Sequence, residues 1–481
     1  MSTTKPWLAV FAAGACEIAC NRLLNADIIA PLSVAAPVAR DTLFIVANIC
    51  PFLLVLFALK RGYLTRMGPW AATASCVLVI AGTLLVGLHA KTGSTAALCG
   101  GYALWQLGSL WATLMYLIAL CQLDNIRSAM LCICASALIG TLGQRAVDLF
   151  SLPMHLILCA VLPCATLALS SHLARENLAL LNETGGLESV ELSNPAAFVS
   201  PLNPAFLCLF VFNLVFGFSL ALNCISGIPV DTSPSGIVTA LLVGGVVVAS
   251  RRRSGFIDPL AALAALVVIA GLLCAIVSLF LPLGSASNYI LRSGSACFSI
   301  IHYLVIFGIG SRNRIGALRV AAWACFLTGL GTLMGTLSGH GVNRLVGTND
   351  ALAAGLLCAI LVSFVALAFL WLAKFSFRAV IFGVEPITPV VAPIESGKER
   401  ESIEDRCARL GTQHGLTKRE VELCALLARG RNGRAISDQL TLSYNTVKTH
   451  VKHIYMKLDV HTQQELIDLV EDGLGRQEEG A

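Results

Sequence analysis

Long apolar windows recur along most of the chain, and they constrain its fold more than any other feature. Because 56% of the 481 residues are hydrophobic and only 13% are charged, the chain is too apolar for a soluble protein of this length. A bilayer-spanning helix needs roughly 20 apolar residues. Twelve windows of about this length lie at residues 7–26, 38–59, 70–90, 96–121, 128–150, 153–171, 204–226, 235–250, 258–281, 286–310, 318–339 and 350–374. We expect an all-α fold, with a multi-pass membrane domain over residues 1–378 whose two six-helix halves are divided near 174–204.

The basic residues between the windows predict the orientation of this bundle, because Lys and Arg collect in cytoplasmic connections. Alternate connections form two sets. One set holds only Arg40, Lys91, Arg292 and Arg344. The other holds 14 basic residues, which are Lys5, Lys60, Arg61, Arg66, Arg127, Arg175, Arg251, Arg252, Arg253, Arg312, Arg314, Arg319, Lys374 and Arg378. We expect the second set, and with it both termini, on the cytoplasmic side of a bacterial cytoplasmic membrane.

The composition changes after Arg378. Residues 383–393 are proline-spaced and residues 395–406 are highly charged, which is typical of a tether. Ile403, Cys407 and Leu410 then recur at helical spacing. We therefore expect a linker with a lead-in helix over 379–410, followed by a separate soluble domain over 411–475.

Four helix starts can be identified in residues 416–469. Two are capping boxes, in which a Thr caps the backbone and a Glu three residues later returns the contact; the others are single Asn and Ser caps. In chain order the starts are Thr417 with Glu420, Asn432, Ser443, and Thr462 with Glu465. The predicted helices end near Gly430, Leu440, Leu458 and Asp472.

The third of these helices, predicted at 444–458, has a buried and a cationic face. The apolar residues at helical spacing are Val447, Val451, Ile454 and Leu458, and the polar residues that share another face are Asn445, Lys448, Thr449 and Lys452. Residues 431–457 contain five basic residues and only one acid, Asp438. A short helix, a tight turn and a basic helix form the helix-turn-helix arrangement, whose second helix lies in the DNA major groove.

These residues resemble the C-terminal DNA-binding domain of LuxR-type response regulators. The resemblance rests on LTKRE at 416–420, LLARG at 426–430, the pair Ile436 and Leu440, and NTVKTHVKHIYMKLDV at 445–460. It implies double-stranded DNA as partner and base contacts from Lys448, Thr449 and Lys452. It also implies that the fourth helix mediates homodimerisation on DNA. The full set that we expect at the DNA is Asn445, Thr446, Lys448, Thr449, His450, Lys452, Lys457 and Arg434. Two positions depart from the family pattern, Asp459 where glycine is usual and Gln463 where arginine is usual.

Six plus six helices with both ends inside resemble the major facilitator architecture. The match concerns topology, because the loop after the second window, Gly62 to Gly68, keeps the glycines, a leucine and an arginine of that family's signature but lacks its acidic residue. The resemblance implies either a transporter or the same fold retained for sensing.

Ionisable and polar side chains inside a membrane are costly, so each is a candidate site. The residues that we expect to contact a ligand in the membrane domain are Glu17, Asn21, Arg22, Arg145, Asp148 and His302. The alternative for each is a hydrogen bond or ion pair that only joins two helices.

The sequence contains no catalytic triad, no Cys/His set with metal-ligand spacing and no phosphate-binding loop. We therefore expect no enzyme, no cofactor and no metal. The favoured hypothesis is a membrane-bound bacterial transcriptional regulator whose membrane domain senses a small molecule or a membrane signal. The alternative is a major-facilitator-type transporter with a regulatory DNA-binding tail.

Overall fold

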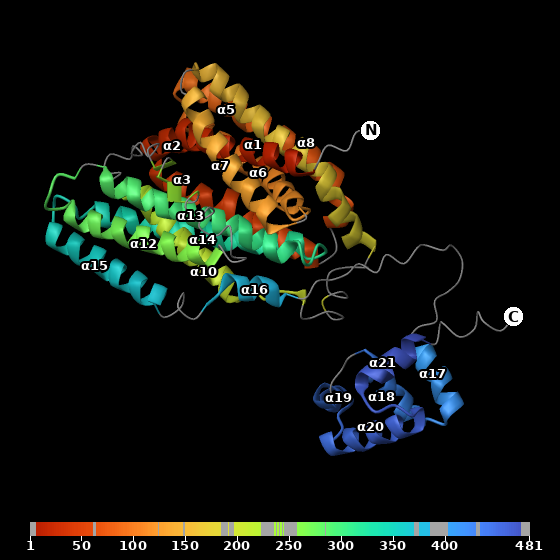
Figure 1. Cartoon of the computed structure of the whole chain (residues 1–481). Helices are drawn as coiled ribbons and strands as arrows, with labels where there is room; N and C mark the ends of the chain where they lie inside the picture. Colours follow the sequence, from red (N-terminus) through yellow and green to blue (C-terminus); the bar gives the residue numbers. More distant parts are fainter. Residues whose placement is uncertain are drawn as a thin grey trace. The chain divides into compact units, whose positions relative to one another are not determined.

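The computed structural model describes residues 6–60, 64–123, 125–147, 150–183, 191, 197–222, 235–236, 238–239, 241–242, 244, 257–283, 285–369, 375–384, 403–429 and 433–472. The regular elements in these ranges are all helices (Figure 1). The chain divides into two compact units, Met1–Thr388 and Pro389–Ala481. Each unit has its own hydrophobic core, so each is described by itself. The predicted all-α fold class is confirmed.

The first half of the membrane unit follows the predicted windows with one difference. The window at 38–59 is divided by a π-helical turn into two α-helices, and a second π-helical turn follows the first helix. The elements are α1 (Pro6–Leu24), η1 (Asn25–Ile29), α2 (Ala30–Ala35), α3 (Pro37–Phe44), η2 (Ile45–Ile49), α4 (Cys50–Lys60), α5 (Leu64–Thr92), α6 (Thr95–Leu120), α7 (Ile126–Val147) and α8 (Leu152–Glu183).

The second half contains helices at all but one of the remaining windows. They are α10 (Pro204–Ala221), α12 (Ile257–Val277), α13 (Ala286–Gly310), α14 (Ala317–Asn343), α15 (Asp350–Leu367) and the short α16 (Phe377–Gly383). The window predicted at 235–250 lies largely outside the described residues. Within the described ranges, nine helical stretches are long and apolar enough to cross a membrane by length and composition.

Glycines bring the helices of this unit into close contact. A Cβ atom at Gly335 of α14 would overlap the carbonyl oxygen of Leu214 on α10, and one at Gly217 of α10 would overlap the carbonyl oxygen of Thr332 on α14. Backbone contact of this kind is how small residues pack membrane helices. α10 and α14 therefore form a tightly packed pair.

The outside of the membrane unit is apolar. Large hydrophobic side chains such as Leu54, Leu84, Leu266 and Val362 are each more than 60% exposed. The interior is apolar as well, and it includes Phe212 of α10 stacked on Phe298 of α13 at 3.7 Å between ring centroids. An apolar exterior of this kind suits lipid as the surrounding solvent, so this unit is a multi-pass membrane domain.

The second unit is a small bundle of five helices in its described part. They are α17 (Ile403–His414), α18 (Lys418–Ala428), α19 (Gly433–Leu440), α20 (Tyr444–Leu458) and α21 (Gln463–Asp472). Its core joins residues from every one of them, including Cys407, Leu423, Ile436, Val447, Ile454 and Leu466. α17 runs through the predicted domain start at residue 411 and packs on the same core, so the lead-in helix is part of this folded unit.

Candidate DNA-binding surface and membrane polar sites

The first helix of the predicted motif begins with the capping box expected from its sequence. The Thr417 hydroxyl accepts a hydrogen bond from the Glu420 amide at 3.3 Å, and Glu420 Oε2 accepts one from the Thr417 amide at 2.8 Å. Gly430 and Asn432, predicted to end this helix and to cap the next, lie outside the described residues. The next helix, α19, nevertheless ends at Leu440 as predicted.

The turn between α19 and α20 is fixed by hydrogen bonds at both of its ends. The Ser437 hydroxyl donates to the Leu442 carbonyl at 2.6 Å, and the Leu442 amide donates to the Ser437 carbonyl at 3.0 Å. Thr441 lies in the left-handed region with a φ of 52°. Ser443 then caps α20 by accepting a hydrogen bond from the Thr446 amide at 3.1 Å. This turn sets the direction in which α20 leaves α19.

α20 exposes the polar face that the sequence predicts. Asn445, Lys448, Thr449 and Lys452 are all exposed. Val447, Ile454 and Leu458 are buried in the core, and Val451 is partly buried against it. Among the described residues, no acid forms an ion pair with Lys448 or Lys452. Two cations one turn apart are therefore presented together on one helix face.

The other predicted DNA-contacting residues are less uniform. Thr446 is exposed, with its hydroxyl 2.7 Å from that of Ser443. His450 is half-buried, and its Nδ1 has no hydrogen-bond partner in the described part of the chain. The side chain of Arg434 lies outside the described residues.

Lys457 has an intramolecular partner that the sequence pattern did not indicate. Its Nζ lies 2.7 Å from Glu420 Oε2 and 2.9 Å from the Gly415 carbonyl oxygen. The hydrogen bond from Lys457, followed by that from the Thr417 amide, lowers the pKa of Glu420 from 4.5 to about 2. Lys457 therefore holds α20 against the start of α18, and a role at DNA stays a prediction for it.

The two departures from the family pattern have local structural roles. Asp459 ends α20 in the left-handed region with a φ of 54°, a conformation that Asp adopts more readily than most residues other than glycine. Gln463 Nε2 donates to the Leu427 carbonyl at the end of α18 at 2.9 Å. Asp459 therefore forms the left-handed turn at the position where the family usually has Gly. Gln463 bonds the end of α18 from the position where the family usually has Arg.

α17 is attached to the rest of its unit by polar contacts as well as by its core residues. Arg429 at the end of α18 pairs with Glu404, and Arg406 donates to the Val470 carbonyl at 3.4 Å.

In the membrane unit, Glu17 is the most completely buried of the predicted ligand residues that can be described. It is 7% exposed, and its Oε1 accepts hydrogen bonds from the Thr113 hydroxyl of α6 at 2.8 Å and from the side-chain Nδ2 of Asn21 at 3.3 Å. The side chains of Arg22 and Arg145, and Asp148 as a whole, lie outside the described residues. Glu17 and Asn21 thus share one face of α1, as their spacing predicts.

His302 contacts one aromatic ring. Its ring stands perpendicular to that of Tyr303 at 5.3 Å, and Tyr303 in turn meets Tyr116 of α6 at 6.0 Å. Nδ1 of His302 is buried and has no hydrogen-bond partner within the described ranges. Within the described ranges, no hydrogen bond or ring contact joins His302 to Glu17.

A short helix after the last long membrane helix is anchored to the bundle. Asp258 of α12 accepts hydrogen bonds from the Ser376 hydroxyl and the Phe377 amide, both at 2.7 Å. Phe377, Ile381 and Val384 are buried in the membrane core. This segment, α16, comes just before the linker, so the exit of the chain from the membrane unit is fixed to α12 and α13.

Comparison with known proteins identifies the second unit. Residues 414–470 match the family model "Bacterial regulatory proteins, luxR family". These residues are therefore a luxR-family domain, and in this chain the domain follows a multi-pass membrane domain.

Curated relatives match a short part of the chain. The chain is 47% identical over 45 residues to the transcriptional regulatory protein LiaR of Bacillus subtilis (strain 168), which is 9% of this chain and 21% of LiaR. It is 43% identical over 60 residues to the uncharacterized response regulatory protein YgeK of Escherichia coli (strain K12), 12% of this chain and 41% of YgeK. With the oxygen regulatory protein NreC of Staphylococcus haemolyticus (strain JCSC1435) it shares 40% identity over 53 residues, 11% of this chain and 24% of NreC. The chain thus spans less than half the length of each.

Solved structures with a similar arrangement are membrane transporters. The fucose:proton symporter FucP of E. coli covers 76% of this chain over 98% of its own length, with a TM-score of 0.47 and 12% identity. The proton:xylose symporter XylE covers 76% over 95%, with a TM-score of 0.49 and 12% identity. At these identities and TM-scores the likeness says nothing about the function or substrate of this chain.

Proposed function

We propose that the chain is a membrane-bound bacterial transcriptional regulator, whose luxR-family domain binds double-stranded DNA and whose membrane domain receives the signal. The observation that carries the proposal is the covalent union of a luxR-family domain with a multi-pass membrane domain. The domain boundaries that we propose are 1–378 for the membrane domain, 379–410 for the linker and lead-in helix, and 411–475 for the DNA-binding domain.

The exposed face of α20 supports the DNA-binding part. Lys448 and Lys452 are exposed on the same side as Asn445 and Thr449, which provides cations for phosphates together with amide and hydroxyl groups for base edges. We propose that Lys448, Thr449 and Lys452 face bases, and that Asn445, Thr446, His450 and Arg434 contribute at the edges of the same surface. A single such domain makes few base contacts, so we also propose a homodimer on paired half-sites.

The anchoring of α16 supports the sensing part. Because Asp258 holds the start of α16 and the core holds Phe377 and Ile381, a shift of α12 or α13 moves the point where the linker leaves the membrane domain. The contacts of Glu404 and Arg406 then transmit tension on the linker to α18 and α21. A ligand near Glu17 and Asn21, or near His302, would act by shifting these helices, with both termini on the cytoplasmic side.

The proposal is tested with the full-length chain in lipid nanodiscs and a pool of random double-stranded DNA. We expect selection of a preferred sequence, with an affinity that falls as salt rises because bound phosphates release counterions. Lys448→Ala should reduce that sequence preference. The matched control is Lys418→Ala, which removes another exposed lysine of the same domain but lies outside the proposed surface. Equal binding by wild type and Lys448→Ala would contradict the proposed surface.

The alternative function is transport, with the DNA-binding domain as a regulatory tail. It is favoured by the buried Glu17 carboxylate, since its contact with Thr113 crosses from α1 to α6 and a buried acid in a membrane bundle is a common place for a transported ion or solute. Flux in proteoliposomes that Glu17→Gln abolishes would support transport. Ligand binding without flux would support the sensor.

A further inference from the structure

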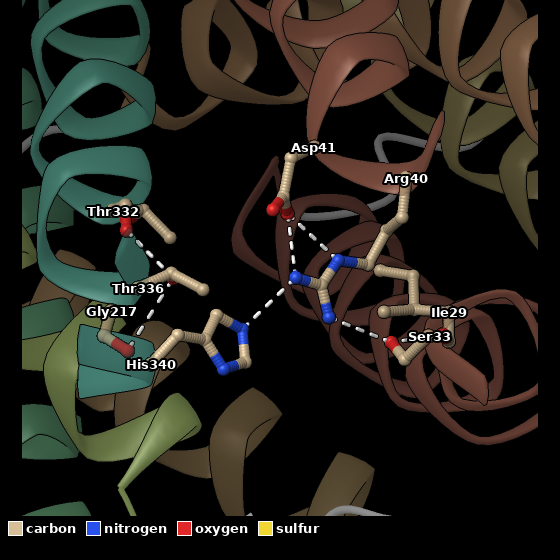
Figure 2. Close-up of polar contacts among 8 residues, drawn as sticks. All are labelled: Ile29, Ser33, Arg40, Asp41, Gly217, Thr332, Thr336 and His340. Atoms are coloured by element: carbon tan, nitrogen blue, oxygen red, sulfur yellow. Dashed lines mark hydrogen bonds and ion pairs between the residues drawn. The ribbon is translucent and has the colours of Figure 1, made fainter. Parts of the chain in front are cut away.

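A polar cluster joins the first half of the membrane domain to the second half (Figure 2). Arg40 lies on α3, and its guanidinium donates to Asp41 Oδ1 from Nε at 2.8 Å and from one terminal nitrogen at 2.6 Å. The other terminal nitrogen donates to the Ser33 hydroxyl at 2.9 Å. The nitrogen that contacts Asp41 also lies 3.0 Å from Nε2 of His340 on α14. This last contact joins residues 300 positions apart in the sequence.

Each side of the contact is held firmly by its own half. Ser33, which receives Arg40, donates in turn to the Ile29 carbonyl at 2.6 Å. On the other side, α14 is packed on α10 through its glycines, and Thr336 donates to the Thr332 carbonyl at 2.8 Å and lies 3.4 Å from the Gly217 carbonyl (Figure 2). The Arg40–His340 contact therefore depends on the relative position of the two halves at this end of α14.

The chemistry of the contact fixes the protonation state of His340. A guanidinium has five N–H donors and no acceptor, so the facing Nε2 must offer a lone pair. His340 is then neutral, with its proton on Nδ1. When His340 takes up a second proton, Nε2 becomes a donor, the hydrogen bond is lost, and a second cation lies beside Arg40.

The other charged groups around His340 have opposing effects on its protonation. Asp41 offsets part of the charge of Arg40, and Arg344, one turn after His340, adds a further positive charge. Arg40 and Asp41 come from α3, whereas Arg344 follows α14 itself. Arg40 and Arg344 therefore act against a positive charge on the imidazole, and Asp41 acts in favour of it.

We propose that Arg40 and His340 form a proton-sensitive latch between the two halves of the membrane domain. Neutral His340 holds α3 against α14, and protonated His340 releases them. In the proposed orientation the latch faces outward, since Arg40 and Arg344 belong to the set of connections predicted outside. That the latch provides the regulator's input, with the proton as signal, rests on the proposed function. The existence of the latch does not rest on it.

The test measures hydrogen-deuterium exchange of the full-length chain in lipid nanodiscs at pH 7.5 and pH 5.5, with exchange times scaled for the intrinsic pH effect. The ordinary pKa of histidine, about 6.5, lies between these values. We expect exchange in α3 and in the last turns of α14 to rise on the order of tenfold at pH 5.5, the size expected for loss of a hydrogen bond to a charged group.

Two variants of one residue separate the latch from a general effect of acid. His340→Gln keeps a neutral acceptor at both pH values and should stay closed at both. His340→Lys carries a charge at both and should already be open at pH 7.5. His89→Gln is the matched control, because His89 bonds the Ser94 carbonyl within the first half and its loss should leave the wild-type response intact.

Two outcomes would overturn the latch: wild-type exchange in α3 and α14 that does not change with pH, or a His340→Gln variant that opens at pH 5.5 as the wild type does. DNA binding is measured separately on the same nanodiscs. Because exchange is recorded without DNA, the exchange data alone test the latch. Failure of the chain to bind DNA would refute only the proposed regulator.

Discussion

Replacing Lys457 by Met tests how the DNA-binding unit holds α20 in place. The substitution keeps the apolar stem and removes the ammonium that lies 2.7 Å from Glu420 Oε2. Glu420 is 3% exposed, so its carboxylate would remain buried with the Thr417 amide as its principal donor. Removing one partner of a buried pair destabilises more than the pair contributes, because the remaining charge is left uncompensated.

The magnitude follows from the pKa of Glu420. A fall from 4.5 to about 2 corresponds to roughly 3.5 kcal/mol at about 1.4 kcal/mol per pKa unit. Part of the shift comes from Thr417 and remains in the variant. The Lys457 side chain is 35% exposed, so solvent screens its share. We therefore expect Lys457→Met to lower the free energy of unfolding by about 1–2 kcal/mol at pH 7.

The pH dependence has a definite sign. The pKa of Glu420 is lower in the folded unit than in the unfolded chain, so the stabilisation is fully present above about pH 4.5 and is lost as pH falls toward 2. Wild type should therefore lose stability over this range. Lys457→Met should lose less, so the two should converge in acid.

The assay is urea unfolding of residues 389–481, monitored by circular dichroism at pH values from 2.5 to 7. This fragment is suitable because it has its own core. Lys452→Met is the control, since Lys452 lies on the same helix and is exposed; it should change the unfolding free energy by less than about 0.5 kcal/mol. Equal effects of the two substitutions at pH 7 would refute the reasoning.

Three further predictions concern packing, the exit helix and DNA. Gly335→Leu should abolish the monodisperse peak of the membrane protein in size-exclusion chromatography, because its Cβ would overlap the α10 backbone. Gly341→Ala, with nothing within 4 Å of the new Cβ, should behave as wild type. A monodisperse Gly335→Leu variant would contradict the close packing. Asp258→Ala should raise hydrogen exchange in α16 at least fivefold by removing its acceptor for the Phe377 amide, and unchanged exchange would show that the anchor is not needed. Lys448→Ala should reduce the slope of log affinity against log salt by about 1 if it contacts phosphate and mainly lower sequence preference if it contacts bases; an unchanged slope with unchanged preference would exclude both.

Local signals predicted the second unit well. The third helix was predicted at 444–458 and is found at Tyr444–Leu458, because Ser443 caps its start and Asp459 ends it through contacts within a few residues. The buried stripe of Val447, Ile454 and Leu458 followed from spacing alone. Helix caps and helical periodicity act over one or two turns, so they can be identified without knowledge of the fold.

Contacts between distant parts of the chain could not be predicted in this way. Lys457 was expected at DNA, but its partner Glu420 lies 37 residues away, and only the fold brings them together. The same holds for Arg40 with His340, and for Asp258 with the start of α16. The π-helical turn that divides the window at 38–59 was also missed, because an apolar window predicts helix but does not predict its hydrogen-bond register.

The polar residues of the membrane domain were only partly predictable. A charge in an apolar window marks Glu17 as notable, and its burial against Thr113 and Asn21 fits both a ligand contact and a bond between helices. Spacing could place Glu17 and Asn21 on one face. It could not show which residue of α6 would meet them.

The central claim is that a protein embedded in the membrane binds specific DNA through α20. The most direct measurement is chromosomal occupancy of the full-length protein, recovered from the membrane fraction after cross-linking, for wild type and Lys448→Ala at equal abundance. We predict a small number of discrete wild-type sites that share a sequence and are lost in Lys448→Ala. Occupancy that is uniform, or that is identical in the two proteins, would contradict the claim.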